Sequence, residues 1–290
     1  MFENKPVIIN GCTVVDIVMS LDKLPSNQQD VHLHRQEMRI GGCAFNVMKI
    51  VKALEIPYVF NSVVGKGMYG KSVSDYLKSE GIDYHFDQEG EHGCCYCLID
   101  ESKDRTFISN HGIEYGFDKT GVEALGLPEG CLTYFCGLEV EERNGEDIVS
   151  YVKEHDQKIC FAPGPRFDHI PAERLEAMLD HTYLLHINEE EAYRLSHTTN
   201  IPDALTSLHE RTKGIVILTE GSKGAHFISD EGIGFVTSFP CEIKDTVGAG
   251  DSHCGGVLAG LALWGDLSKA VELGNYTAMC ILSGKTIERF

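Results

Sequence analysis

The stretch of sequence that decides the fold lies near the C-terminus, where residues 245–251 read Asp-Thr-Val-Gly-Ala-Gly-Asp. Gly248 and Gly250 flank Ala249, and residues this small let backbone N–H groups approach a ligand closely. The apolar run 257–264 follows and predicts a helix, so the stretch should lie at a helix N-terminus. Such a terminus carries unpaired N–H groups and a partial positive charge, and it therefore favours an anion.

Asp251 closes this stretch although it is itself an anion. Its position makes chemical sense if the carboxylate takes a proton from an attacking hydroxyl while the amides of 248–250 hold a transferring phosphoryl group. We expect His253, two residues further on, to pack or to support the site rather than to act as the base. The stretch therefore predicts a kinase that acts on an alcohol.

Composition and charge limit the classes of protein that fit. The chain has 290 residues, enough for one large α/β domain or two small ones, and 44 acidic against 25 basic residues give a net charge of −19. This acidity argues against nucleic acid or an anionic membrane as a partner, because both require basic patches. No apolar stretch of the sequence approaches the roughly 20 residues that cross a bilayer. Residues 1–6 also lack the apolar core of a signal peptide, so we expect a cytoplasmic protein.

The chain contains 11 cysteines, which lie mostly singly in apolar segments. Such cysteines commonly behave as small buried hydrophobic residues in a reducing compartment. Cys94, Cys95 and Cys97 form the only cluster in the sequence. A zinc site would require a second pair of ligands at a suitable spacing, and the sequence offers no clear one.

Strand-like and helix-like segments alternate along most of the chain, which predicts a parallel sheet with helices on both faces and ligands at the carboxyl ends of its strands. Residues 28–41 and 92–109 instead contain half-exposed strand patterns, for example at 31–34 and 105–108. We therefore predict one α/β domain over 1–290, with strands of a small β lid inserted at about 12–40 and 92–110. The predicted strands of the main sheet are 6–11, 58–64, 132–136, 159–162, 183–187, 214–219 and 224–228, and the predicted helices include 44–54, 71–80 and 172–179.

Two segments near the N-terminus are candidates for binding an acceptor. Residues 41–46 read Gly-Gly-Cys-Ala-Phe-Asn, where Gly41 and Gly42 permit close backbone approach and Asn46 can hydrogen-bond the hydroxyls of a polyol. An ordinary strand-to-helix turn explains the same residues equally well. We expect Asp16 to close the first strand, where its carboxylate can accept two hydroxyl hydrogens, although alone it fits a solvated turn residue better.

Two further segments follow strands in the C-terminal half. Asn188 and Glu191 lie three apart in the first turn of an expected helix, where they share a face and could hold a hydrated Mg²⁺. Acidic residues at a helix start also simply complement the helix dipole. Residues 219–224 read Thr-Glu-Gly-Ser-Lys-Gly, join two strands, and could fold over a nucleotide phosphate.

A second phosphate-binding pattern competes with the C-terminal glycine stretch. Residues 65–72 read Gly-Lys-Gly-Met-Tyr-Gly-Lys-Ser, which matches the P-loop pattern between a strand and a helix. The apolar segment ending at Asp100 could pass for its metal-binding strand. This interpretation leaves the C-terminal stretch without a role. The two alternatives differ in the residue that must be essential, Asp251 or Lys71.

Six features in the same order resemble the ribokinase-like (PfkB) family of carbohydrate and nucleoside kinases. The matching features are 245–251 (the C-terminal signature), 41–46 (the N-terminal glycine signature), 188–191 (an N-x-x-E motif), 219–224 (a T-x-G-x-x-G turn), Asp16 (the substrate-binding aspartate) and 65–70 (in place of a Val-Gly-x-Asp-x-x-Gly turn). The resemblance implies a central, mainly parallel sheet flanked by helices, and a β lid that closes on the substrate and excludes water.

The resemblance also implies a role for each candidate residue. Asp251 would deprotonate the acceptor hydroxyl, and Gly248, Ala249 and Gly250 would donate amides to the γ-phosphoryl group of ATP; Asp16, Gly41, Gly42 and Asn46 would hold the acceptor; Asn188, Thr219, Gly221 and Gly224 would border the nucleotide; Asn188 and Glu191 would position Mg²⁺ through water. Phosphoryl transfer consists mostly of positioning and charge stabilisation, and these parts supply both.

Some positions depart from the family pattern or stay undecided. Lys66 and Gly67 stand where the family has an acidic step. A monovalent cation such as K⁺ has room near Asp245 and the C-terminal loop, but no residue pattern supports it. Arg105 and the Asn-His pair at 110–111 could enter the site from the lid.

The sequence indicates a class of acceptor but not a particular compound. An anionic acceptor would require a dedicated Arg or Lys, and no basic cluster indicates one, so we expect a neutral sugar or nucleoside. Lid strands with one exposed face could pair two copies of the chain as a homodimer. A catalytically inactive sugar or nucleoside sensor is a further alternative, which an intact Asp251 with both loop glycines disfavours.

Overall fold

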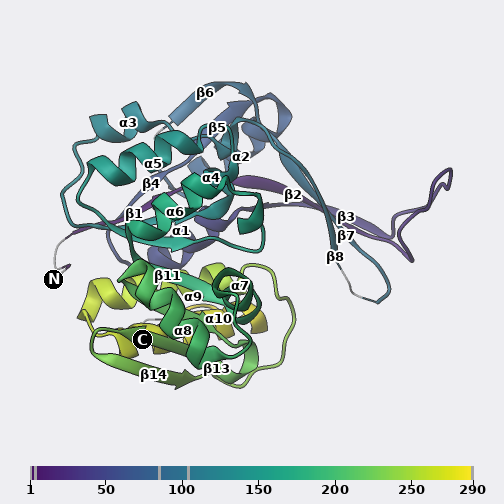
Figure 1. The fold of residues 1–290 in the computed structure, drawn as a ribbon. Helices are drawn as coiled ribbons and strands as arrows, with labels where there is room; N and C mark the ends of the chain where they lie inside the picture. Colours follow the sequence, from purple (N-terminus) through teal and green to yellow (C-terminus); the bar gives the residue numbers. More distant parts are fainter. Residues whose placement is uncertain (1, 3–4, 84–85, 103–104, 289–290) are drawn as a thin grey trace.

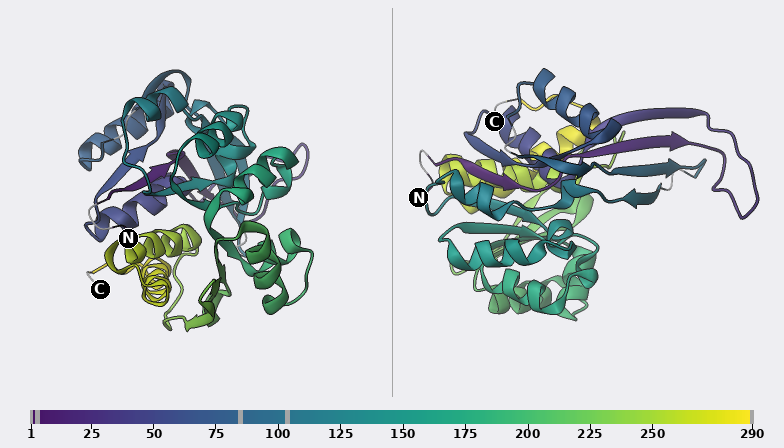
Figure 2. Two further views of the ribbon diagram at one scale, coloured as in Figure 1. Left: turned by 60° about the vertical axis from the view of Figure 1, so that its left-hand side comes forward. Right: turned by 90° about the horizontal axis from the view of Figure 1, so that it is seen from above.

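The centre of the computed structural model, which describes residues 2, 5–83, 86–102 and 105–288, is an eight-stranded sheet with helices on both faces (Figure 1; Figure 2). In spatial order its strands are β4 (Tyr58–Asn61), β1 (Val7–Asn10), β9 (Leu132–Cys136), β10 (Lys158–Ala162), β11 (Thr182–Asn188), β12 (Ile215–Thr219), β13 (Gly224–Ser229) and β14 (Gly232–Thr237). The first six pair in parallel, and β13 and β14 continue the sheet antiparallel. The predicted α/β class with a mainly parallel sheet is confirmed.

Two groups of helices bury the two faces of this sheet, because side chains alternate along each strand and both faces are apolar. One face packs against α1 (Cys43–Ala53), α2 (Gly67–Ser79), α9 (Ala249–Trp264) and α10 (Leu267–Ser283). The other packs against α5 (Gly145–Glu154), α6 (Ala172–Asp180), α7 (Glu189–Ser196) and α8 (Ile201–Thr212), with the short α3 (Lys119–Ala124) and α4 (Gly137–Glu141) beside them. None of the helices within the described residues combines the length and apolar character that a membrane span requires.

A second sheet extends away from this body as a long arm, visible at the right of Figure 1. Its strand order is β3 (Arg35–Gly41), β2 (Val14–Ser20), β7 (Cys94–Ile99) and β8 (Arg105–Asn110). We call this sheet the lid. A separate parallel pair, β5 (Val63–Lys66) and β6 (Phe86–Glu91), lies near its base.

A buried carboxylate fixes the base of the lid. Glu114 is fully buried and accepts hydrogen bonds from the amides of Gly93 (2.7 Å) and Gly112 (3.0 Å), one beside β7 and one beside β8. His92 adds a second tie, because its ring bonds the Gly65 amide at 3.1 Å and the Thr13 carbonyl at 3.0 Å. These contacts set where the lid strands leave the body.

Several predicted element boundaries were wrong for identifiable reasons. The single strand expected over 58–64 is divided into β4 and β5 at Ser62, whose buried hydroxyl bonds the Thr13 hydroxyl at 2.9 Å. The segment 31–34 is not a strand, because the pairing of β3 with β2 begins only at Arg35. The helix expected over 71–80 begins earlier, at Gly67.

Candidate active site

The predicted phosphate-binding stretch lies at a helix N-terminus, as expected, but the helix begins sooner than its apolar run suggested. Gly248 adopts a left-handed backbone (φ 74°) as the N-cap residue, and α9 starts at Ala249. Its first half is rich in small residues because neighbouring helices approach closely: a Cβ on Gly256 would lie 2.4 Å from the hydroxyl of Thr277 in α10. An apolar pattern cannot reveal such a helical segment.

Asp251, the predicted base, lies in the first turn of α9 and faces α1. The side-chain amide of Asn46 donates to its Oδ2 at 2.9 Å, and the Cys43 thiol also donates to the carboxylate. Burial raises the pKa of Asp251, and these two donors oppose that rise. The left-handed backbone of Gly248 (φ 74°) favours glycine here, and a Cβ on it would also press on Asn46, at 3.1 Å from the side-chain amide nitrogen. The structure thus brings Asn46 and Asp251 together across 205 residues of sequence.

The predicted acceptor residues gather on the lid face next to α1. The expectation that Asp16 closes the first strand was wrong. Asp16 lies inside the lid strand β2, because the chain turns at Gly11 (φ 139°) before β2 begins. A Cβ on Gly41 would lie 2.2 Å from Asp16 Oδ2, and one on Gly42 would lie 2.6 Å from the Cys12 carbonyl oxygen. A side chain at position 41 would therefore displace the Asp16 carboxylate, and one at position 42 would clash with the backbone.

The environment of Asp16 perturbs its ionisation. Burial raises the pKa of Asp16 to about 6, and the charge of Arg39, directly opposite on β3, counteracts part of this rise. The carboxylate can therefore lose its charge under mildly acidic conditions.

Sequence reasoning missed a second buried carboxylate at this site. Glu139 in α4 is 2% exposed, and its Oε1 accepts the Cys12 amide at 2.8 Å. Its Oε2 is buried without a hydrogen-bond partner among the described residues. Burial raises the pKa of Glu139 to about 7, and the nearby Asp251 charge adds to the rise. The sequence did hold one indication of this role, because Glu139 follows the apolar strand β9 and so lies at the carboxyl edge of the sheet.

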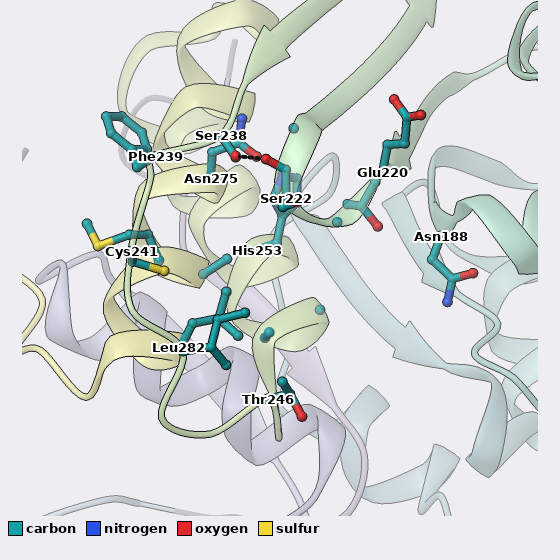
Figure 3. Close-up of a pocket in the computed structure, with 18 of the residues that line it drawn as sticks. Asn188, Glu220, Ser222, Ser238, Phe239, Cys241, Thr246, His253, Asn275 and Leu282 are labelled. Atoms are coloured by element: carbon teal, nitrogen blue, oxygen red, sulfur yellow. Dashed lines mark hydrogen bonds between the residues drawn. The ribbon is translucent and has the colours of Figure 1, made fainter.

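The predicted nucleotide residues line one cavity of about 750 Å³ beside the N-terminus of α9. Figure 3 shows this cavity between Asn188 and Glu220 on one side and Phe239, Cys241 and Leu282 on the other. Its volume falls within the range of small-molecule sites. The predicted residues that line it are Asn188, Thr219, Gly221, Gly224, Ala249 and Gly250.

Asn188 and Glu191, the predicted magnesium residues, bond each other at the start of α7. Asn188 Oδ1 accepts the Glu191 amide at 2.9 Å, and Glu191 Oε2 accepts the Asn188 amide at 3.2 Å, which is a capping box. Burial raises the pKa of Glu191. Among the described residues no group of three or more His, Cys, Asp or Glu side chains could hold a metal ion. Mg²⁺ characteristically keeps several waters and binds substrate phosphates, so this pair fits contact through water.

Comparison with known proteins settles the family. A model of the pfkB family carbohydrate kinases matches residues 7–287. An uncharacterized sugar kinase of Escherichia coli (strain K12), YegV, is 31% identical over 282 residues, which cover 95% of this chain and 88% of that protein. The chain belongs to the pfkB family of carbohydrate kinases.

Solved structures agree with this family in fold. Ribokinase from Thermotoga maritima matches with a TM-score of 0.85 at 19% identity, covering 96% of this chain and 93% of that one. A double mutant of fructokinase from Vibrio cholerae, solved with fructose, ADP and a potassium ion bound, matches with a TM-score of 0.77 at 21% identity, covering 96% and 92%. The ribokinase-like fold expected from the sequence is confirmed.

The competing P-loop pattern of this pfkB-family chain does not form a P-loop. The helix α2 already begins at Gly67, so most residues of the pattern are helical. Lys71 pairs with Asp75 at 2.5 Å and is 75% exposed, and the Ser72 hydroxyl donates to Met68 O. The supposed metal-binding strand is β7, a lid strand that pairs with β2 and β8.

A pair of buried histidines, one on β11 and one on α9, lies beside the cavity of Figure 3, which His253 lines. His186 Nε2 and His253 Nδ1 are 2.8 Å apart, and both side chains are at least nine-tenths buried. Burial lowers the pKa of His186 to about 4 and also lowers that of His253. Both rings are therefore neutral near pH 7, in line with the expected supporting role of His253.

Proposed function

We propose that this pfkB-family kinase transfers the γ-phosphoryl group of ATP to a hydroxyl of a neutral sugar or nucleoside, with Asp251 as the general base. One observation carries the proposal. The Asp251 carboxylate, held by Asn46, lies in the helix turn that separates the lid face bearing Asp16 from the nucleotide-sized cavity. A base at that junction is within reach of both substrates of a transfer reaction.

The nucleotide side supports ATP as the donor. Apolar side chains such as Phe239 and Leu282 line the cavity, and so do Ala249 and Gly250 in the first turn of α9. The amides of Ala249 and Gly250 belong to that first turn, where helix N–H groups lack helical partners. A bound Mg²⁺ would neutralise negative charge on the phosphates. Asn188 and Glu191 would orient its waters.

The acceptor side supports a neutral alcohol. Three carboxylates, Asp16, Glu139 and Asp251, gather there, and all three have raised pKa values. Carboxylates accept hydrogen bonds from hydroxyl groups but repel an anionic acceptor. Arg39 and Arg105 on the lid are already engaged with carboxylates.

The proposed step moves one proton and one phosphoryl group. As the acceptor oxygen forms its bond to the γ-phosphorus, its proton passes to an Asp251 carboxylate oxygen, and the bond between the γ-phosphorus and the bridging oxygen breaks with ADP as leaving group. The amides at the start of α9 stabilise the charge on the transferred phosphoryl oxygens. The raised pKa of Asp251 makes it a better proton acceptor than an exposed aspartate would be.

A phosphorylation screen tests this function. Neutral sugars, sugar acids, sugar phosphates and nucleosides are incubated with MgATP, and phosphorylated products are detected by mass spectrometry. We expect product with a neutral sugar or nucleoside. Exclusive phosphorylation of anionic acceptors contradicts the acceptor class, and binding without product for every acceptor supports the sensor alternative.

Two variants then locate the chemistry. Asp251→Asn should lower kcat by about 10²–10⁴-fold, the usual worth of a general base, and leave MgATP binding nearly unchanged in calorimetry. Lys71→Ala is the matched control, because Lys71 lies on the exposed face of α2 and should have no effect. Near-normal turnover of Asp251→Asn, or inactivation of Lys71→Ala, contradicts the assignment.

A further inference from the structure

Two arginines from opposite edges of the lid meet on one carboxylate of the phosphate-binding loop. Arg39 on β3 places Nη1 3.3 Å from Asp245 Oδ2, and Arg105 on β8 places Nη2 2.7 Å from Asp245 Oδ1. Arg105 Nη1 also donates to the Thr246 hydroxyl at 3.0 Å. β3 and β8 are the outer strands of the lid, three strand spacings or about 14 Å apart. We call Arg39, Arg105 and Asp245 the arginine clamp.

Both arginines lie on the lid face that carries Asp16. In the register of the sheet Arg39 stands opposite Asp16, Asp16 opposite Cys95, and Cys95 opposite Ser109. Side chains alternate along a strand, so Arg105, four residues before Ser109, shares that face. The clamp therefore spans the whole width of the lid and connects it to the loop that leads to the predicted base.

The oxygens around this carboxylate are already bound by N–H groups of the chain. Asp245 Oδ1 also accepts the Val247 amide at 2.9 Å. The neighbouring carbonyl of Leu282 accepts the amides of Lys244 (2.7 Å) and Asp245 (3.3 Å). Together with the arginine bond to Thr246, these contacts engage the carboxylate of Asp245, the hydroxyl of Thr246 and the carbonyl of Leu282.

The charge around Asp245 also leaves little reason for a further cation. Burial disfavours ionisation of Asp245, but the Val247 amide and the two guanidinium groups outweigh burial and lower its pKa. The resemblance to the family left room for a monovalent cation here, and the Vibrio cholerae fructokinase structure contains potassium. The residues of this chain do not fit such an ion at Asp245.

We propose that the arginine clamp takes the place of a monovalent cation, so that phosphoryl transfer by this protein requires none. Positive charge from the lid neutralises Asp245 and holds the turn 245–247, which leads into Gly248 and the first turn of α9. Arg39 and Arg105 are positioning residues in this scheme. Because both stand on the lid, the loop is held only while the lid lies over it.

The first test compares monovalent cations in the wild-type protein. Initial rates with MgATP and an accepted alcohol are measured in chloride salts of potassium, sodium and tetramethylammonium at equal ionic strength, which keeps general screening constant. We expect equal kcat and KM in all three salts. Stimulation by potassium over tetramethylammonium overturns the proposal.

The second test removes the clamp. Arg105→Ala should lower kcat by roughly 10- to 100-fold, the loss typical of a misplaced reacting group, with a smaller change in KM. Arg105→Lys should recover part of kcat, because lysine keeps the charge but loses the bidentate contact. Arg35→Ala is the control, since Arg35 is an exposed lid arginine at the start of β3 and pairs with Glu37 rather than with Asp245. Equal kcat for Arg105→Ala and Arg35→Ala overturns the proposal.

The third test does not depend on activity, so it separates this proposal from the proposed function. Crystals of the wild-type protein with ADP are grown with rubidium chloride in place of potassium chloride, and anomalous scattering locates bound rubidium. We expect no rubidium within bonding distance of Asp245 and both guanidinium groups on its carboxylate. A rubidium ion bound to Asp245 overturns the clamp even if the protein proves to be an active kinase.

Discussion

The proposed acceptor side and the proposed nucleotide side of the candidate site offer a ligand different chemical groups. The acceptor side places Asp16 and Glu139 in surroundings that raise their pKa values to about 6 and about 7. The nucleotide side offers backbone groups of strand-to-helix and strand-to-strand turns, and apolar side chains such as Phe239 and Leu282. The first side is suited to recognising hydroxyl groups through charged oxygens, and the second to enclosing a ligand by shape.

This difference predicts that changes on the two sides have different kinetic consequences. Substitutions on the acceptor side should alter catalysis and its pH dependence. Substitutions on the nucleotide side should alter mainly the affinity for nucleotide.

The largest effect on substrate recognition is expected at Asp16. Asp16→Ala should lower kcat/KM for the acceptor by about 10²- to 10⁴-fold, because each of the two hydrogen bonds that a charged group accepts from hydroxyls contributes some 1.5–3 kcal/mol. The KM for MgATP should change little. Steady-state kinetics with each substrate varied in turn measures both.

A control separates lost recognition from lost folding. Asp22→Ala removes an exposed carboxylate, and among the described residues its ion pair is with His34. It should leave both constants unchanged. An equal rise of both KM values in Asp16→Ala would contradict the division between the two sides.

The pH dependence of the reaction is the second prediction. A carboxylate with a raised pKa is ionised only above that value, so it loses its accepting character as the pH falls through it. kcat/KM for the acceptor should therefore fall as the pH drops from 7 towards 5, through the pKa values of Glu139 (about 7) and Asp16 (about 6). Nucleotide binding measured by calorimetry should change far less over this range. A flat acceptor profile between pH 5 and 7 would contradict the prediction.

The nucleotide side should respond mainly through affinity. Phe239 lines the cavity and packs edge-on against Tyr276, with ring centroids 6.1 Å apart. Phe239→Ala should weaken MgATP binding by about tenfold, within the worth of one aromatic contact, with kcat nearly unchanged. Phe235→Ala is the control, because Phe235 on β14 is 48% exposed and lies outside the cavity. A fall in kcat without a change in affinity would contradict the expected difference between the two sides.

The sequence predicted features that depend on local residue types. Gly248 adopts a left-handed backbone at the N-cap, and Gly41 lies against Asp16 where a side chain would meet the carboxylate. Glycine at these two positions is therefore a sequence signal for both sites. The alternation of strands and helices predicted the fold class for the same reason. Such features depend on residues that are close together in the sequence.

Features that depend on distant contacts could not be predicted in the same way. Glu139 joins the site through the Cys12 amide, 127 residues away, and only because β1 and β9 are neighbours in the sheet. The sequence suggested that Arg105 could enter the site from the lid, but its contact with Asp245, 140 residues away, depends on the path of the lid. No local pattern encodes either contact, since each depends on where the chain returns after a long excursion.

The buried pair His186 and His253, of which His253 lines the cavity, predicts a pH dependence of folding stability rather than of catalysis. Burial lowers the pKa of both rings, so the folded protein binds fewer protons than the unfolded chain below the ordinary histidine pKa of about 6.5. Stability from these groups is therefore present above pH 6.5 and is lost as the pH falls towards 4, at up to about 1.4 kcal/mol per pH unit for each histidine. Urea unfolding of wild type and of a His186→Leu/His253→Phe double variant at pH 7 and pH 5 measures this term. The variant should lose less stability than wild type on acidification, because the raised carboxylate pKa values contribute equally to both proteins and cancel. Identical pH slopes would show that the histidine pair does not titrate with unfolding.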